Sequence, residues 1–276
     1  MHKIVILLYL IFGQTLGLYA QETRLEAQLH APVHWAKTAR STLALIPKRN
    51  MQQVDGGWQL SGRKMSELGY CDDAEFSDQR LIANCSGSLI AENKVLTAAH
   101  CLTGHNSQCE DYAFVFDYAL KKGPNKDYFV RDDQVYFCDE VVHFEFNPRN
   151  MSVDLAIVKL QKAVTDRRPV DLNRQVPEIG EPLTMIGHPM GIFQKFVDQS
   201  EVLKIDMEKL SFRHRLQTYS VNSGGPIFNA NQEQIGVLVR STKPNMQRRE
   251  GESCYDWGVY NEQMYSEANL LINLPL

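Results

Sequence analysis

A hydroxyl-bearing turn followed by an apolar run lies in the second half of the chain and reads Tyr219-Ser220-Val221-Asn222-Ser223-Gly224-Gly225-Pro226-Ile227-Phe228. Two glycines follow Ser223, so no bulky side chain crowds its hydroxyl group on that side. A serine hydroxyl attacks a carbonyl carbon when a neighbouring base removes its proton. The stretch therefore makes Ser223 a candidate nucleophile and predicts a β-strand directly after it.

Two other stretches supply the partners that such a serine needs. T-A-A-H-C (97–101) carries His100 after a strand-like run, and D-L-A-I-V (154–158) opens another such run with Asp154. Histidine suits the role of general base because its pKa lies near neutrality, and a carboxylate fixes its tautomer. Either residue alone is more often structural, as a buried histidine or a turn aspartate. Their combination with Ser223 favours His100 as the base and Asp154 as its orienting carboxylate.

Length, charge and the N-terminus narrow the class of protein. A chain of 276 residues can form one large or two small cores, and a net charge of −4 gives no basic surface for nucleic acid. Lys3, the apolar residues 4–12 and Ala20 form the pattern of a cleaved signal peptide over 1–20. The apolar run is too short for a membrane anchor. We expect a secreted or periplasmic protein without membrane attachment after cleavage.

The six cysteines indicate disulfides, because an even number after a signal peptide is typical of proteins from oxidising compartments. Six cysteines allow 15 pairings. Cys85 and Cys101 flank the strand and turn that carry His100 and are the pair that local sequence supports. Cys109 and Cys138 bracket one hairpin region, which leaves Cys71 with Cys254. No Cys-x-x-Cys pair or zinc-type histidine spacing is present, so we expect neither metal nor cofactor.

Short segments rich in Val, Ile, Phe and Tyr recur between turns, which predicts an all-β barrel or sandwich. The segment 161–182 contains prolines and charges and reads as a connection between two halves. The expected organisation is an N-terminal arm or leader (21–37), a first domain (38–165) and a second domain (166–276). Apolar residues three to four positions apart in 261–274 predict a short C-terminal helix.

The three motifs T-A-A-H-C, D-L-A-I-V and N-S-G-G-P, in this order, resemble those of the trypsin-like (chymotrypsin-fold) serine peptidases. The resemblance covers about residues 38–260 and is closer to the bacterial glutamyl-endopeptidase-like branch, which carries N-S-G at the serine. It implies two antiparallel six-stranded barrels with the active site in the cleft between them. It also implies an endopeptidase that cleaves protein or peptide substrates, with His100, Asp154 and Ser223 as its triad. We expect the secreted protein to be a monomer.

Val221 and Asn222, the two residues that precede Ser223, depart from the family pattern. The family's oxyanion hole uses the backbone N–H groups of the serine and of the residue two positions earlier, here Ser223 and Val221. That earlier residue is usually glycine, and a β-branched residue resists positive φ. Either the turn uses angles that valine adopts, or substrate rotates the peptide into place. Asn222 replaces the aspartate that pairs with a new N-terminus in the digestive enzymes, so we expect no such activation.

Val221 also motivates the main alternative, a weakened or inactive homologue that acts as a binding protein. An esterase that uses the same triad is a third possibility. By the family's positions, the pocket for the substrate side chain is lined by Gln217, Thr218, Leu238, Val239 and Arg240. Gln217 is not the aspartate of a Lys/Arg-selective pocket, and Leu238 replaces the histidine of glutamate-selective members. We expect a neutral side chain to be preferred, while Arg240 either faces a substrate acid or is an ordinary exposed strand residue.

Overall fold

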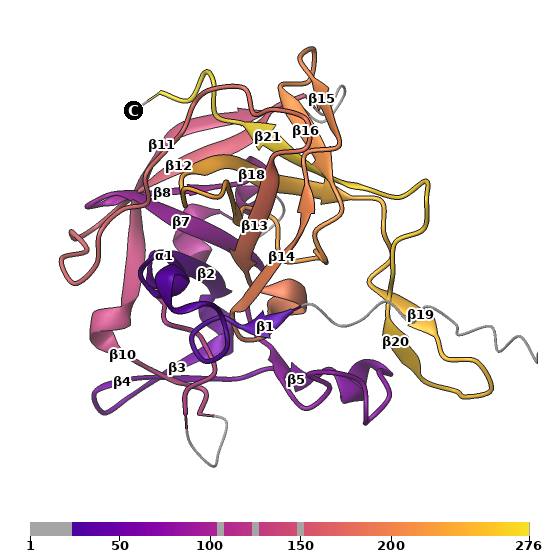
Figure 1. Ribbon diagram of the computed structural model, residues 1–276. Coiled ribbons are helices and arrows are strands. Elements are labelled where there is room, and N and C mark those ends of the chain that lie inside the picture. The colour runs from indigo at the N-terminus through magenta and orange to yellow at the C-terminus, as the bar shows by residue number, and fades with distance from the viewer. Residues whose placement is uncertain (1–23, 104–107, 123–126, 148–151, 276) are drawn as a thin grey trace, which may run out of the picture.

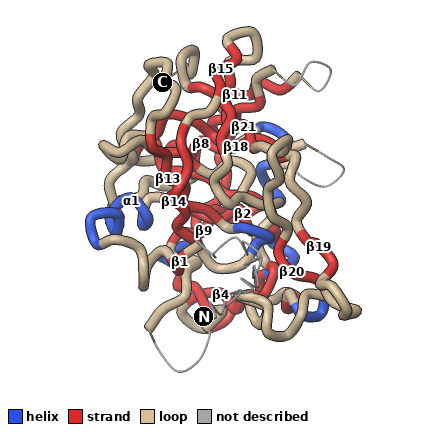
Figure 2. The backbone as a smooth tube through the Cα atoms, turned by 45° about the vertical axis from the view of Figure 1, so that its right-hand side comes forward, coloured by secondary structure: helices blue, strands red, loops and turns tan. Residues whose placement is uncertain are grey.

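The computed structural model describes residues 24–103, 108–122, 127–147 and 152–275. Nearly all of its regular structure is β (Figure 2), which confirms the predicted all-β class. The predicted signal peptide, residues 1–20, lies outside the described residues. The described part of the chain contains no helix that is long and apolar enough to cross a membrane.

Six antiparallel strands of the first half close into a barrel in the order β11-β12-β8-β7-β2-β9 (Figure 1). They are β2 (Thr42–Pro47), β7 (Cys85–Ala91), β8 (Lys94–Thr97), β9 (Tyr112–Phe116), β11 (Val135–Phe146) and β12 (Asp154–Leu160). Every residue of β2 is buried. Leu43 and Leu45 point into the main core, whereas Ala44 and Ile46 join a second apolar cluster outside it. This follows from the alternation of side chains along a strand.

The second half forms a curled sheet of eight strands in the order β1-β14-β13-β17-β18-β21-β16-β15. They are β1 (Leu25–Glu26), β13 (Pro182–Gly187), β14 (Lys195–Glu201), β15 (Lys204–Asp206), β16 (Ser211–His214), β17 (Pro226–Phe228), β18 (Gln234–Ser241) and β21 (Ser266–Leu270). The expected second six-stranded barrel is therefore only approximate, since the described strands do not close on themselves. Part of the outer edge of β14 is taken by β1 from the N-terminal arm.

The predicted C-terminal helix is wrong. The segment instead contains β21, which pairs with β16 on one side and β18 on the other. All five of its residues are buried, including Glu267 and Asn269. A helix would have left its polar face in water, but the two strand partners satisfy the backbone, and Arg213 and Arg240 pair with Glu267. Local apolar spacing does not reveal such long-range pairing.

Smaller elements surround the two halves. The short strands are β3 (Met51–Val54), β4 (Gly57–Leu60), β5 (Arg63–Lys64), β6 (Arg80–Leu81), β10 (Phe129–Arg131), β19 (Met246–Arg248) and β20 (Tyr255–Trp257). The helical elements are α1 (Ala36–Arg40) and the 3-10 turns η1 (Val33–Trp35), η2 (Lys48–Asn50), η3 (Ser66–Leu68), η4 (Ala99–Leu102), η5 (Cys109–Asp111), η6 (Asp132–Gln134) and η7 (Pro189–Gly191). The β19–β20 hairpin projects to the right of the body in Figure 1.

The main apolar core joins the two halves. Leu155 and Ile157 of the barrel share it with Phe196 and Phe228 of the second sheet. The ring of Trp35, from the N-terminal arm, contacts both phenylalanine rings edge-on, with centroids 5.6 and 5.7 Å away. The two halves therefore pack against each other through a shared core, which brings together the groups that each one contributes to the site.

Candidate active site

His100 and Asp154 meet through the pairing of two barrel strands. His100 lies in η4 directly after β8, and Asp154 is the first residue of β12, which pairs with β8. His100 Nδ1 lies 2.5 Å from Asp154 Oδ2, and the His100 backbone N–H donates to Asp154 Oδ1 over 2.8 Å. An ionised carboxylate can only accept, so the ring carries its proton on Nδ1. The other ring nitrogen, Nε2, is left free to act as a base.

The second sheet holds Asp154 in place. The Asp154 backbone N–H donates to Asn269 Oδ1 over 3.0 Å, and Asn269 Nδ2 donates to the carbonyl of Ser152 over 2.7 Å. Asn269 is fully buried in β21. Sequence reasoning missed this residue because it lies in the segment that was predicted as a helix. The sequence shows Asn269 as an amide among apolar residues, and its role beside Asp154 can be recognised only once the strand pairing is known.

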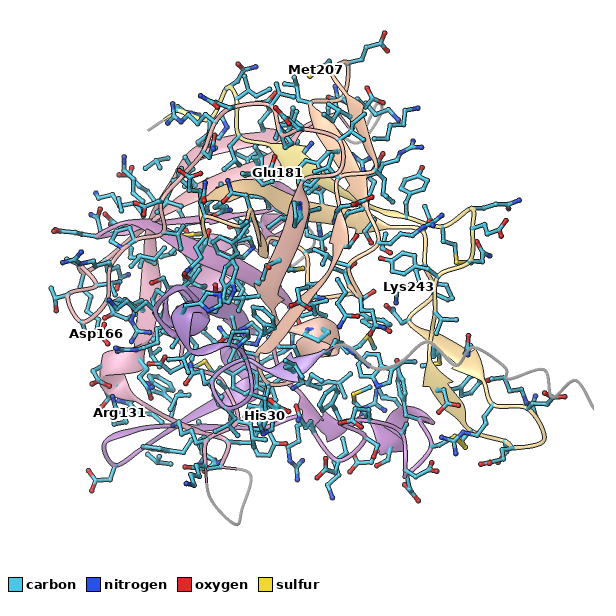
Figure 3. All side chains as sticks on the ribbon, in the orientation of Figure 1. His30, Arg131, Asp166, Glu181, Met207 and Lys243 are labelled. Carbon is cyan, nitrogen blue, oxygen red and sulfur yellow. A yellow bond between two sulfur atoms is a disulfide. The ribbon has the colours of Figure 1, made fainter. Side chains whose placement is uncertain are left out.

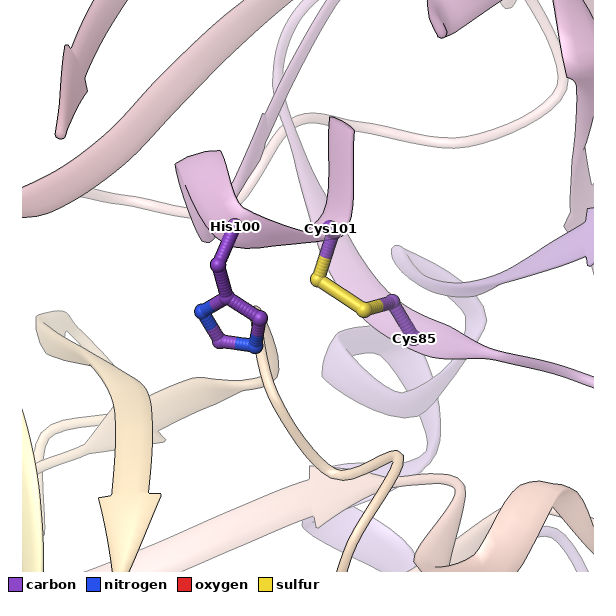
Figure 4. A group of neighbouring side chains, drawn as sticks. All are labelled: Cys85, His100 and Cys101. Carbon is purple, nitrogen blue, oxygen red and sulfur yellow. A yellow bond between two sulfur atoms is a disulfide. The ribbon is translucent and has the colours of Figure 1, made fainter. Parts of the chain in front are cut away.

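The structure contains the disulfides Cys71–Cys254, Cys85–Cys101 and Cys109–Cys138, the same pairs that the sequence favours. Cys101 follows His100 in the 3-10 turn, and its bond to Cys85 ties that turn to β7 (Figure 4). Cys85, His100 and Cys101 place three potential ligand atoms within 4.8 Å of one another. Two of these atoms are disulfide sulfurs and cannot serve as thiolate ligands. This cluster therefore positions the histidine rather than forming a metal site.

Ser223 lies where the two halves touch. Its carbonyl accepts the N–H of Ser86 over 2.8 Å, and the N–H of Gly224 donates to the carbonyl of Leu238 over 2.8 Å. Gly224 has φ +82°, and a Cβ there would lie 2.1 Å from Thr97 Oγ1. Only glycine fits this contact, both for its φ and for the space available. The close approach places Ser223 beside the barrel turn that carries His100.

Val221 has φ +74°, the left-handed value that a β-branched residue resists. It is the third residue of a four-residue turn in which the carbonyl of Tyr219 accepts the N–H of Asn222 over 3.1 Å. Positive φ at this position but not at Ser220 corresponds to a type II turn, for which glycine is preferred. The turn thus keeps a glycine-type conformation although it contains valine. Neither of the two interpretations above fits this turn, because valine has an angle that it resists and the peptide already has the glycine-type orientation without substrate.

Neighbouring groups hold this turn in place and leave two donors free. The carbonyl of Ser220 accepts the N–H of Met190 over 2.7 Å, and the Ser86 hydroxyl donates to the carbonyl of Val221 over 3.1 Å. Across a trans peptide the N–H of Val221 points opposite to the carbonyl of Ser220. Within the described residues, neither Val221 N–H nor Ser223 N–H makes a hydrogen bond. This arrangement can bind a negatively charged oxygen.

His100, Val221 and Ser223 line one open cavity of about 350 Å³. Within the described residues, no hydrogen bond joins the Ser223 hydroxyl to the His100 ring. Catalytic hydrogen bonds are often long without substrate and tighten in the complex. The cavity is thus lined by a residue with a hydroxyl, by a histidine that Asp154 contacts, and by residues with two free backbone donors, a set of groups suited to acyl transfer.

The five candidate pocket residues are not all open to substrate. Leu238 and Val239 are buried, and the fully buried Thr218 is joined through Oγ1 to Ser266 Oγ over 2.7 Å. Arg240 Nε pairs with Glu267 Oε2 over 2.9 Å, so its charge is largely compensated. Gln217 alone among the five lines a cavity of about 210 Å³.

The same cavity contains a lysine that sequence reasoning missed. Lys243 is 6% exposed, and its Nζ lies 3.0 Å from the Tyr219 ring centroid and donates to the carbonyl of Gly258 over 3.2 Å. Figure 3 shows it at the start of the segment that leads to the β19–β20 hairpin. No local motif distinguishes this lysine from the many surface lysines of the chain.

Two buried histidines give the fold a pH dependence of its own. His188 and His214 are fully buried, and this burial lowers the pKa of each to about 3. Both are therefore neutral in the folded protein at pH 7. The unfolded chain regains the ordinary histidine pKa near 6.5 and binds more protons below it. Their contribution to stability is complete above about pH 6.5 and is lost as the pH falls toward 3.

We therefore expect the free energy of unfolding to fall with decreasing pH by up to roughly 1.4 kcal/mol per pH unit for each histidine. Urea unfolding at several values between pH 7 and pH 4.5 measures this slope. His214→Asn keeps an acceptor near the Nδ1 position, which binds the N–H of Leu216, and should flatten the slope. His143→Asn, at a more exposed position, should leave it unchanged. An identical slope in wild type and His214→Asn would contradict the assignment.

The barrel, the curled sheet and the paired His100 and Asp154 define a peptidase fold of the chymotrypsin type. A family model described as a trypsin-like peptidase domain matches residues 85–237, and the chain belongs to this family. A solved structure of a Glu endopeptidase in complex with MPD is similar in fold, with a TM-score of 0.52 and 14% sequence identity. The match covers 91% of this chain and 92% of that chain. No curated protein matches the sequence.

These findings confirm the resemblance drawn from the three motifs. The family and the fold both support a peptidase, that is, a hydrolase of peptide bonds. At 14% identity the solved structure carries information on the fold and none on side-chain preference. The roles of individual residues therefore depend on the geometry of this chain.

Proposed function

We propose that this protein is a secreted serine endopeptidase that works through an acyl-enzyme. Ser223 is the nucleophile, His100 the general base and Asp154 the carboxylate that orients it. The observation that carries the proposal is the bidentate contact of Asp154 with His100, through Nδ1 over 2.5 Å and the backbone N–H over 2.8 Å. It leaves Nε2 unprotonated in the cavity that Ser223 also lines.

In the first step Ser223 Oγ attacks the scissile carbonyl carbon while His100 Nε2 takes the hydroxyl proton. The N–H groups of Val221 and Ser223 stabilise the negative charge that develops on the carbonyl oxygen. His100 then gives its proton to the leaving amine, and the acyl group stays on Ser223. A water molecule, deprotonated by His100, attacks the acyl-enzyme and releases the second product and the free serine.

The substrates we propose are proteins or peptides, cleaved by a monomer outside the cytoplasm, in the secreted or periplasmic space. The three disulfides support an oxidising compartment. Preference for a neutral substrate side chain stays a prediction from Gln217 and Leu238. A proteome-derived peptide library read by mass spectrometry measures both turnover and this preference.

A fluorophosphonate probe tests the proposal directly, because it reacts only with an activated serine. We expect the folded mature protein to be labelled, and mass spectrometry to place the label on the peptide that contains Ser223. Protein unfolded in urea before the probe is added is the control and should not react. Absence of labelling in the folded protein would contradict the proposal.

The alternative is an inactive homologue that binds peptides, and it is motivated by the valine that stands where the family usually has glycine, although φ +74° at Val221 keeps the glycine-type turn. In that case Val221→Gly should react with the probe while the wild type does not. Robust turnover by the wild type would exclude the alternative.

A further inference from the structure

Arg24, in the N-terminal arm, is 2% exposed and sits among aromatic rings. Its guanidinium carbon lies 3.7 Å from the ring centroid of Trp257, 4.7 Å from that of Tyr219 and 5.2 Å from that of Phe76. A guanidinium within about 6 Å of a ring centroid is attracted by the ring, and the attraction strengthens when water is excluded. One of these rings belongs to the residue that begins the turn before Ser223.

The residues after Arg24 anchor the arm. Glu26 pairs with Lys195 across the β1–β14 ladder, which forms one edge of the second sheet (Figure 1). Their side chains form an ion pair of 3.0 Å and are 5% and 1% exposed. Gln79 bonds to both, to Glu26 Oε1 over 2.5 Å and to Lys195 Nζ over 2.8 Å. A buried ion pair with such additional bonds fixes the register of the arm, and therefore the place of Arg24.

The rings around Arg24 come from separate parts of the chain that are tied together. Tyr219 and Trp257 contact each other edge-on with centroids 4.5 Å apart. Trp257 lies on β20, and the Cys71–Cys254 disulfide links the loop before that strand to the segment that contains Phe76. Arg24 therefore packs into an aromatic cluster in which the segments of Trp257 and Phe76 are linked by a disulfide and Tyr219 contacts Trp257.

The same cluster supports the peptide between Ser220 and Val221. Tyr219 precedes this peptide, and the side chain of Met190 packs against the cluster. The N–H of Met190 is the donor that holds the carbonyl of Ser220 over 2.7 Å. The start of the turn thus contacts Arg24 through Tyr219, and the residue that orients its central peptide packs against the apolar cluster that includes Tyr219 and Trp257.

This central peptide has two competing orientations. In a type II turn φ is positive at the third residue, whereas in a type I turn it is near −90° and the central peptide is rotated. Valine prefers negative φ, so by itself the turn would favour the type I orientation. In that orientation the N–H of Val221 would no longer point away from Met190. Strained angles of this kind persist only where the surroundings impose them.

We infer that Arg24 is a positioning residue for the oxyanion hole. By stacking on Tyr219 and Trp257 it holds the strained turn, so that the N–H of Val221 faces the cavity with His100 and Ser223. The importance of this for catalysis rests on the proposed function. The orientation of the peptide itself can be measured without any turnover.

The first test uses protein labelled with ¹⁵N-valine, in which the amide signal of Val221 is identified by its absence in Val221→Gly. Arg24→Ala should shift this signal or split it in two, because the turn is no longer held in one orientation. Arg213→Ala is the matched control, since the Arg213 guanidinium carbon lies 3.9 Å from the Tyr265 ring, in the second sheet. It should leave the Val221 signal in place. An unchanged signal in Arg24→Ala overturns the inference whether or not the protein is active.

The second test is a double-mutant cycle in peptide hydrolysis. Arg24→Ala should lower kcat by about ten- to hundredfold, less than the 10²–10³ typical of losing an oxyanion donor outright, with KM changed less than about threefold. In the Val221→Gly background the same substitution should cost less than about threefold, because glycine adopts positive φ without strain. Equal losses in both backgrounds would contradict a role through Val221.

Arg24→Lys keeps the positive charge but loses the planar guanidinium, so its kcat should lie between those of wild type and Arg24→Ala. It is also the variant to use if Arg24→Ala does not fold, which circular dichroism will show. If the wild type neither turns over peptides nor reacts with the fluorophosphonate probe, the proposed function fails. The amide signal of Val221 still decides the inference about Arg24 in that case.

Discussion

Ser223→Ala is expected to lower kcat for peptide hydrolysis by about 10⁵–10⁶-fold, because the attacking oxygen is removed while the rest of the site stays in place. The thermal unfolding midpoint should not fall, since within the described residues the Ser223 hydroxyl makes no hydrogen bond. Steady-state hydrolysis of a fluorogenic peptide measures the loss. The small remaining rate would come from the backbone donors and substrate binding.

Ser220→Ala is the matched control, because Ser220 lies in the same turn and its hydroxyl bonds to Asn245 Nδ2 over 2.7 Å. We expect its kcat to stay within about threefold of the wild type, since its hydroxyl takes no part in the proposed steps. A Ser223→Ala variant that kept more than about one part in a hundred of the wild-type kcat would contradict the assignment of the nucleophile.

Asp154→Asn is expected to lower kcat by about 10⁴-fold with little change in the fold. In the wild type one carboxylate oxygen accepts the His100 backbone N–H and the other faces Nδ1. An asparagine that keeps its oxygen on the backbone N–H turns its NH₂ group toward Nδ1. The ring must then carry its proton on Nε2, where the base should be free. Stopped-assay kinetics with the fluorogenic peptide measure the loss.

Asp139→Asn serves as the control for this change, because Asp139 is an exposed aspartate of the same barrel whose ion pair is with Lys159. Its kcat should equal that of the wild type within error. If Asp154→Asn retained activity near that of Asp139→Asn, Asp154 would not be the orienting carboxylate. The ¹H NMR signal of the His100 Nδ1 proton, expected far downfield in the wild type, should then also be insensitive to Asp154.

Some of the fold can be read from short segments because their physical basis is local. The strand-like runs around Val95, Ile157 and Ile227 are buried strands in the structure, since continuous apolar stretches must be covered on both faces. The helix expected over residues 261–274 is wrong because that expectation, too, depends on the local pattern alone. Their apolar spacing fits a helix locally, whereas β16 and β18 on either side make the segment a strand.

The sequence by itself determined the family, and it supplied the chemical groups of the proposed site. Ser223, His100 and Asp154 are recognisable because their motifs are short, contiguous and in a fixed order. The sequence also pointed to Val221 as a residue of the proposed oxyanion hole, without giving its backbone angle. A β-branched residue by itself prefers negative φ, but the contacts made by neighbouring groups determine the φ that it adopts in the fold.

The tertiary structure decided what the sequence left open at that turn. Val221 has φ +74° although valine disfavours it, because the N–H of Met190, the hydroxyl of Ser86 and the packing of Tyr219 act on the turn together. The most distant of these groups, the Ser86 hydroxyl, lies 135 residues from Val221 in the sequence. Asn269 behind Asp154 and Arg24 beside Tyr219 are likewise contacts over long sequence separations. No local pattern encodes such contacts, since they exist only after both halves of the chain have packed.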